Sequence, residues 1–247
     1  MTELRNIKEY LRRRTETDYL MPIWLPFLPF ILIIVGLFGF LGTTLMGQES
    51  VLLGGWLMMM LLILSGAIIN LYVLYKWLKR RNGHFNRRLM LHDSFLDYLK
   101  ELSHKKDIDI TETVSDAKRE IREAQREETE KNAVLYLALY LVFPPVLFYM
   151  YHFLNKDFLK HARREETIIE KFNVALNKLE IDEQIENFQR DYNYPDRNTI
   201  IYLVLTLVTA GLFGLYWIYT LTMDPNNHFE QHQKIETNMI ETLKNIE

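Results

Sequence analysis

Four long stretches without a charged side chain alternate with strongly charged stretches along the 247-residue chain. The uncharged stretches are residues 22–46, 51–75, 133–154 and 199–223. A helix rises 1.5 Å per residue, so 25 helical residues reach roughly 38 Å, more than the ~30 Å hydrocarbon core of a bilayer. Backbone polar groups in lipid must be satisfied within their own segment, which favours a helix for each stretch. The pattern predicts an all-α integral membrane protein with four membrane segments.

The charged stretches carry apolar residues at intervals of three and four, which is typical of long amphipathic helices facing the cytoplasm. We therefore divide the chain into seven parts. They are a basic N-terminal helix (1–20), a transmembrane hairpin (21–78), a cytoplasmic helical arm (79–132), a third membrane segment kinked at Pro144-Pro145 (133–154), a second helical arm (155–198), a fourth membrane segment (199–223) and a C-terminal amphipathic helix (224–247). We expect Asp224-Pro225 to end the fourth segment, because proline removes a helical backbone donor.

Basic residues on both sides of the first hairpin predict its orientation. Arg12, Arg13 and Arg14 precede it and Lys79 follows it, and such residues concentrate on the cytoplasmic side of spanning helices. We expect a multi-pass protein of the cell membrane with both termini in the cytoplasm. The third and fourth stretches could each be a span or a re-entrant hairpin. Their lengths favour spans, because half of either stretch is too short to cross.

A short phrase recurs after three of the uncharged stretches. It reads Asn82-Gly-His-Phe85, Asn155-Lys-Asp-Phe158 and Asn226-Asn-His-Phe229, and the last two continue in register with histidine, glutamate and Ile-Glu. This indicates an internal repeat of a membrane element followed by an amphipathic helix. We expect each asparagine to cap a new helix and each phenylalanine to lie at the membrane surface. The expected interface anchors are Asn82, Phe85, Asn155, Phe158, Asn226, Phe229 and Trp217.

The fourth stretch contains Thr209-Ala-Gly211-Leu-Phe213-Gly-Leu-Tyr216-Trp217-Ile-Tyr219. It resembles the T-x-G-[IL]-[YF]-x-x-Y-W-x-Y signature of a domain-of-unknown-function family of small prokaryotic membrane proteins. The third stretch departs from the signature, because Phe143-Pro144-Pro145 stands where Thr-x-Gly would be. The resemblance implies a membrane location in bacteria or archaea and carries no activity with it.

Composition narrows the possible functions. The chain has no cysteine, which excludes disulfides, cysteine-ligated metals and thiol catalysis. Its net charge of −3, with acids and bases interleaved, gives no reason to expect nucleic-acid binding. The uncharged stretches lack the paired ionisable groups that proton-coupled transport usually needs. No phosphate loop, serine elbow or dinucleotide fingerprint is present, so we expect no catalytic residue and no cofactor.

Three histidines are the candidates for metal binding. His228 and His232 lie one helical turn apart, and His161 holds the position in the phrase that His232 holds. Imidazoles at this spacing can bind a metal. No HExxH frame accompanies them, so the interpretation as amphipathic side chains without a metal is favoured.

The leading hypothesis for function is a non-enzymatic structural, scaffolding or assembly protein. It would act through its amphipathic helices, with the lipid bilayer, further copies of itself or a membrane-complex partner as binding partners. One alternative is a channel or passive transporter subunit lined by Ser65, Asn70, Thr206 and Thr209. The other is a metal-dependent membrane enzyme that uses the three histidines.

Overall fold

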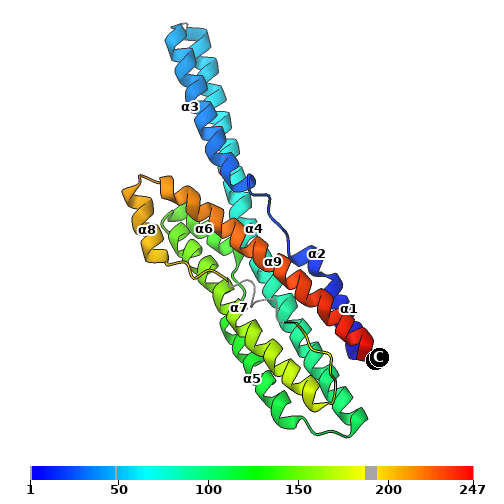
Figure 1. Cartoon of the computed structure of the whole chain (residues 1–247). Coiled ribbons are helices and arrows are strands. Elements are labelled where there is room, and N and C mark those ends of the chain that lie inside the picture. Colours follow the sequence, from blue (N-terminus) through cyan, green and yellow to red (C-terminus); the bar gives the residue numbers. More distant parts are fainter. Residues whose placement is uncertain (1, 48, 187–193, 247) are drawn as a thin grey trace.

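The computed structural model describes residues 2–47, 49–186 and 194–246, and every regular element in these ranges is a helix (Figure 1). In chain order they are α1 (Thr2–Arg12), α2 (Arg14–Thr17), η1 (Leu25–Phe27), α3 (Leu28–Met46), α4 (Glu49–Lys106), α5 (Thr111–Glu127), α6 (Ala133–Val142), α7 (Val146–Lys178), α8 (Thr199–Val208) and α9 (Leu212–Ile246). The prediction of an all-α fold is confirmed. Within the expected arm at 155–198, residues 187–193 lie outside the described residues.

A long apolar hairpin projects from the rest of the molecule (Figure 1). Its first arm is η1 continued by α3, and its second arm is the first half of α4. The helix formed by η1 and α3, and α4, are each long and apolar enough to cross a membrane. Gly47 reverses the chain with a φ of 70°, a conformation that glycine adopts without a Cβ clash. Gly55 lets the two helices approach closely, because a Cβ there would lie 2.1 Å from Thr43 Oγ1.

The third and fourth uncharged stretches are each folded back on themselves. The third ends its first helix at Val142 and resumes at Val146, because prolines at 144 and 145 supply no backbone donor. The fourth turns through Ala210 and Gly211, whose φ values are 48° and 95°. At 10 residues, α6 and α8 are each ~15 Å long, half of a ~30 Å hydrocarbon core. Four membrane spans are therefore not confirmed, and in the described part of the chain only two helices are candidate spans.

The expected end of a helix at Asp224-Pro225 is wrong, because α9 continues through both residues to Ile246. Pro225 has no N–H, so the carbonyl of Leu221 loses its donor one turn later. The buried Arg80 of α4 replaces that donor, with Nη2 at 2.8 Å from Leu221 O and Nη1 at 2.9 Å from Asn226 Oδ1. A contact between two helices thus makes an interior proline tolerable.

No helix begins at Asn82, Asn155 or Asn226, so the expectation that they cap helices is wrong. The asparagines that do cap helices stand at the start of the two short apolar helices. Asn132 Oδ1 accepts from Leu135 N at 3.0 Å before α6, and Asn198 Oδ1 accepts from Ile200 N at 3.0 Å before α8. Each cap satisfies backbone donors at the helix N-terminus.

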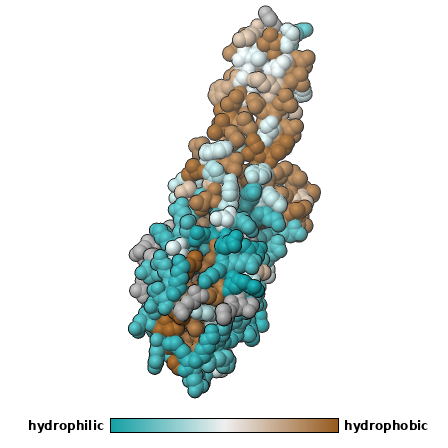
Figure 2. All heavy atoms as spheres, turned by 90° about the vertical axis from the view of Figure 1, so that its right-hand side faces the viewer, coloured by the Kyte–Doolittle hydropathy of each residue, from teal (hydrophilic) through white to brown (hydrophobic). Residues whose placement is uncertain are grey.

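Below the apolar hairpins, the later parts of α4, α7 and α9 form a helical bundle that α1 and α5 cover. Its core contains Ile7 of α1, Phe95 of α4, Ile121 of α5, Phe172 of α7 and Met239 of α9, all essentially inaccessible to solvent. Figure 2 shows the division between an apolar upper part and a hydrophilic surface over the bundle. The amphipathic faces read from the sequence therefore pack against one another within a single chain.

Candidate metal centre

The expected interface anchors lie inside the protein, at the upper end of the bundle. Phe85, Phe158 and Phe229 are at most 2% exposed and pack together, with ring centroids 5.1 Å apart between the first two. Trp217 is fully buried, and the three recurring asparagines are buried as well. A side chain that anchors a helix in lipid headgroups has to reach the surface, so this burial contradicts that role. The phrase falls inside because its helices run unbroken from the apolar part into the bundle.

The phenylalanine cluster gives a direct test of this arrangement. We expect Phe158→Ala to lower the free energy of unfolding by about 3–5 kcal/mol, because it removes a buried ring and leaves a cavity. Val174→Ala on the same helix is the control, since Val174 is exposed and should cost little. The measurement is denaturant unfolding in detergent. Equal stability of the two variants would contradict the packing of this cluster.

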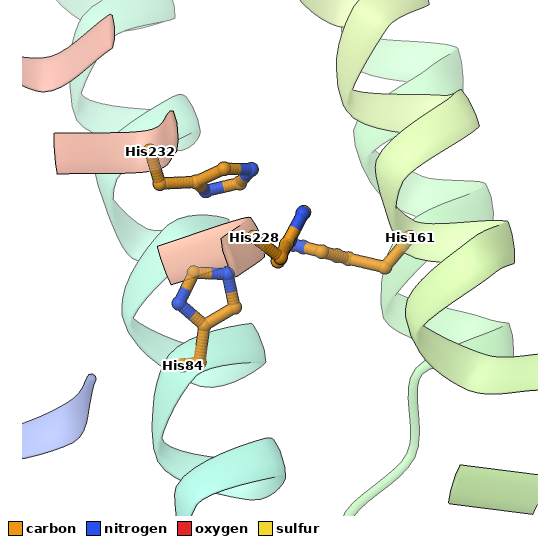
Figure 3. Close-up of side chains that lie close together, drawn as sticks. All are labelled: His84, His161, His228 and His232. Carbon is orange, nitrogen blue, oxygen red and sulfur yellow. The ribbon is translucent and has the colours of Figure 1, made fainter. Parts of the chain in front are cut away.

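Four buried histidines converge directly beside these rings (Figure 3). We call His84 of α4, His161 of α7, and His228 and His232 of α9 the histidine cluster. One nitrogen from each ring can be chosen so that all four lie within 4.8 Å of one another. The structure therefore brings together the three histidines named from the sequence and adds His84.

The recurring phrase explains why these four meet. His84 and His228 both stand two residues after the asparagine, and His161 and His232 both stand six residues after it. The equivalence of His161 with His232 was recognised from the sequence, whereas His84 and its equivalence with His228 were not. The missed signal is the identical Asn-x-His-Phe in Asn82–Phe85 and Asn226–Phe229.

Carboxylates orient three of the four rings. His84 Nδ1 lies 2.9 Å from Asp18 Oδ1, His161 Nδ1 lies 3.0 Å from Glu128 Oε2, and His232 Nε2 lies 2.8 Å from Glu165 Oε2. Metal-binding histidines typically have one ring nitrogen held by such a group, which fixes the tautomer and directs the other nitrogen to the ion. The arrangement is thus of the kind that surrounds bound metals.

Ring nitrogens of all four histidines lack a hydrogen bond. Within the described part of the chain, these are Nε2 of His84, His161 and His228 and both nitrogens of His232, whose Nε2 meets Glu165 as an ion-pair contact without hydrogen-bond geometry. Most buried polar atoms in folded proteins are paired, because an unpaired one costs about 1–3 kcal/mol. Several such atoms at one point, all on metal-ligating side chains, fit a metal ion between them.

The electrostatic environment keeps most of the cluster in the form that binds metal. Burial lowers the pKa of His84 to about 4 and that of His232 to about 3, and it holds the pKa of His228 well below its usual value. These rings are therefore neutral at pH 7, as ligands must be. His161 differs: burial lowers its pKa, but Glu128 and Glu165 outweigh burial and raise it to about 9.

A buried ionic network supports the carboxylates that hold the histidines. Arg88 pairs with Glu165 and lies 2.9 Å from Glu236 Oε1 through Nη1. Arg87 lies 2.7 Å from the same Glu236 oxygen and 2.7 Å from Asp18 Oδ2. We call Arg87, Arg88, Asp18, Glu165 and Glu236 the ionic network. Because its charges are paired away from water, the position of each one depends on its partners.

Imidazole ligands narrow the range of metals. Four imidazole nitrogens suit Zn²⁺, Cu²⁺, Ni²⁺ or iron, whereas Mg²⁺ and Ca²⁺ prefer oxygen ligands. All four rings of the histidine cluster are at most 3% exposed to solvent. Structural sites in proteins fill every coordination position with side chains, while catalytic sites keep one open. The buried histidine cluster therefore resembles a structural metal site.

Comparisons with known proteins give one partial match. No curated protein and no solved structure matches the chain. Residues 197–243 match the family model described as a domain of unknown function, DUF4234. The match covers α8 and most of α9, including the Thr209–Tyr219 signature and both histidines of α9. Over this segment, the chain is similar to a family whose function is not established.

Proposed function

We propose that the protein is a non-enzymatic membrane scaffold whose helical bundle is cross-linked by one transition-metal ion in the histidine cluster. The observation that carries this proposal is the convergence of unpaired, buried ring nitrogens from α4, α7 and α9. An ion bound there would join segments that are far apart in the sequence. Binding energy at such a site adds directly to folding energy when the site exists only in the folded chain.

In this proposal the protein has two spans and both termini in the cytoplasm. The spanning helices are the apolar hairpin of η1, α3 and the first half of α4. Arg12, Arg13, Arg14 and Lys79 all lie at its bundle end, and the loop at the other end contains no Lys or Arg. The positive-inside rule then places the bundle in the cytoplasm.

The burial of all four rings of the histidine cluster favours a scaffold over a metal-dependent enzyme. An enzyme would need an open coordination position and a route for substrate. The apolar helix faces that were expected to bind a partner are already covered, because Phe158, Ile168, Phe172 and Phe229 are buried within one chain. Contacts with a second copy or a membrane partner would therefore use other surfaces.

No specific observation favours a channel. Three of the four polar side chains expected to line it are engaged elsewhere: Asn70 Nδ2 donates to Tyr140 Oη at 3.3 Å, Thr206 to the carbonyl of Tyr202, and Thr209 to that of Leu205, both at 2.7 Å. Hydrogen bonds of this kind stabilise helices and their packing in lipid.

Elemental analysis of the protein tests the proposal. The protein should be purified without a polyhistidine tag and without chelator, and it should contain one equivalent of a transition metal per chain. Protein that stays free of metal after incubation with excess Zn²⁺, Cu²⁺, Ni²⁺ and Fe²⁺ would refute the metal-linked scaffold.

We expect metal affinity to rise with pH between pH 7 and 9. His161 has a pKa of about 9 without metal, so the ion must displace its proton at neutral pH. The apparent affinity should therefore increase about tenfold per pH unit in this range and level off above it. Isothermal titration calorimetry in two buffers with different ionisation enthalpies measures the released proton. An affinity independent of pH from 7 to 9 would contradict binding by His161.

A further inference from the structure

The two folded-back apolar segments expose a surface that nothing in the described chain covers. We call α6 with the first turns of α7, and α8 with the first turns of α9, the short hairpins. At their tips Val142 is 85% and Val208 78% accessible, and Phe143 and Leu212 are also exposed. In water, a turn of this kind would usually carry polar residues. The tips therefore need an apolar environment.

A hydrogen bond between helices gives the depth of these tips relative to the spanning helices. Asn70 of α4 donates to Tyr140, which lies in the last turn of α6. From Asn70, the uncharged part of α4 extends back to Val51, a further ~29 Å along the helix. Toward the bundle, the uncharged part of α4 ends at Tyr75, only ~8 Å from Asn70, so the tip of α6 lies within the bundle-side half of a ~30 Å hydrocarbon core and far from its other side. In Figure 1, α8 and α6 likewise end far below the top of α3.

The bases of the short hairpins have the residues of a membrane–water boundary. Before α6, Lys131 lies over the ring of Phe153 at 5.3 Å. Before α8, Arg197 donates to Tyr202 at 3.2 Å and pairs with Asp224 at 2.9 Å. Aromatic rings with polar ends, next to basic side chains, are typical of the headgroup layer. This boundary lies at the bundle end of the apolar hairpin, because Trp77 of α4 belongs to the same core cluster as Ala133 and Phe153. Lys76 and Tyr72 of α4 also contact each other there, where the uncharged stretch ends.

We propose that the short hairpins insert into the bundle-side leaflet of the bilayer and do not cross it. Lipid is the occupant of their exposed faces, because these faces continue the apolar surface of the spanning helices (Figure 2) and end at a basic, aromatic border. The protein then has a larger cross-section in one leaflet than in the other. Insertion into one leaflet couples binding to membrane curvature, and it favours a membrane that is convex on the bundle side.

Single-cysteine labelling tests this placement, and the absence of native cysteine makes the background clean. Phe143→Cys and Ala210→Cys report on the two tips. Ser115→Cys, exposed on α5, marks the bundle side, and Ser50→Cys, exposed at the start of α4, marks the opposite side. Each full-length variant is reconstituted in vesicles of phosphatidylcholine and phosphatidylglycerol and treated with a membrane-impermeant maleimide from one side at a time.

We expect the impermeant reagent to label position 115 from the bundle side, position 50 from the other side, and neither tip from either side. A membrane-permeant maleimide fluorophore should label both tips, and nitroxide-labelled lipids should quench it there. Labelling of either tip from the side that labels position 50 would show a span and overturn the proposal. Labelling of the tips from the bundle side would place them in water, and a tip fluorophore that lipids do not quench would place them against protein. Either result would also overturn the proposal.

Discussion

Removing the bound metal is expected to lower the melting temperature of the purified protein by about 8–16 °C. An ion held at about a thousandfold above its dissociation constant stabilises the folded state by ~4 kcal/mol. One kcal/mol corresponds to about 2–4 °C for a chain of this size. The measurement is thermal unfolding in detergent before chelation, after chelation, and after the metal is restored. The loss should be reversed on restoring the metal.

The sharpest variant for this test is His228→Leu. It should abolish the response of the melting temperature to metal, because His228 supplies one of the four converging nitrogens. Without metal, the same variant should be as stable as the parent or more stable, since leucine replaces a buried ring nitrogen that has no partner. A histidine with only a structural role would instead destabilise the protein in both conditions when replaced. His104→Leu is the matched control, because His104 is exposed at the end of α4. A metal response that survives in His228→Leu would contradict the histidine cluster as the binding site.

Breaking the ionic network at Arg88 should also have a large effect. We expect Arg88→Met to lower the free energy of unfolding by about 3–5 kcal/mol, because it leaves buried carboxylates without their main cation. Burial alone would raise the pKa of Glu165, but Arg88 and the neighbouring histidines hold it well below its usual value. With methionine at position 88 that carboxylate loses its largest stabilising contact. The measurement is denaturant unfolding at pH 7.

Arg119→Met is the control for this prediction. Arg119 is 63% exposed and lies 3.7 Å from Asp116, a surface pair of the kind that contributes at most about 1 kcal/mol. If both variants lost the same small amount of stability, the ionic network would not be a buried, interdependent set. The Arg88→Met variant should also bind metal more weakly, because Arg88 holds Glu165 and Glu165 orients His232.

The sequence could predict part of the metal centre. The spacing of His228 and His232 and the equivalence of His161 with His232 follow from the recurring phrase. His84 could have been found from the same phrase, by comparing Asn82–Phe85 with Asn226–Phe229. Asp18 and Glu128 could not, because each reaches its histidine from a different segment through packing. The spacing of residues along the sequence does not indicate such a contact.

The sequence by itself determined that the chain is helical, which stretches avoid water, and which residues recur beside them. These properties depend on local composition and on the 3.6-residue period of the helix. Tertiary structure decided whether each apolar stretch crosses or turns back, and whether a helix ends at its proline. Arg80 allows α9 to continue past Pro225 because it donates to the carbonyl that Pro225 leaves free, and Asn70 meets Tyr140 because α6 stops beside the middle of α4. Such contacts join residues distant in the sequence, so their free energy cannot be read from either segment alone.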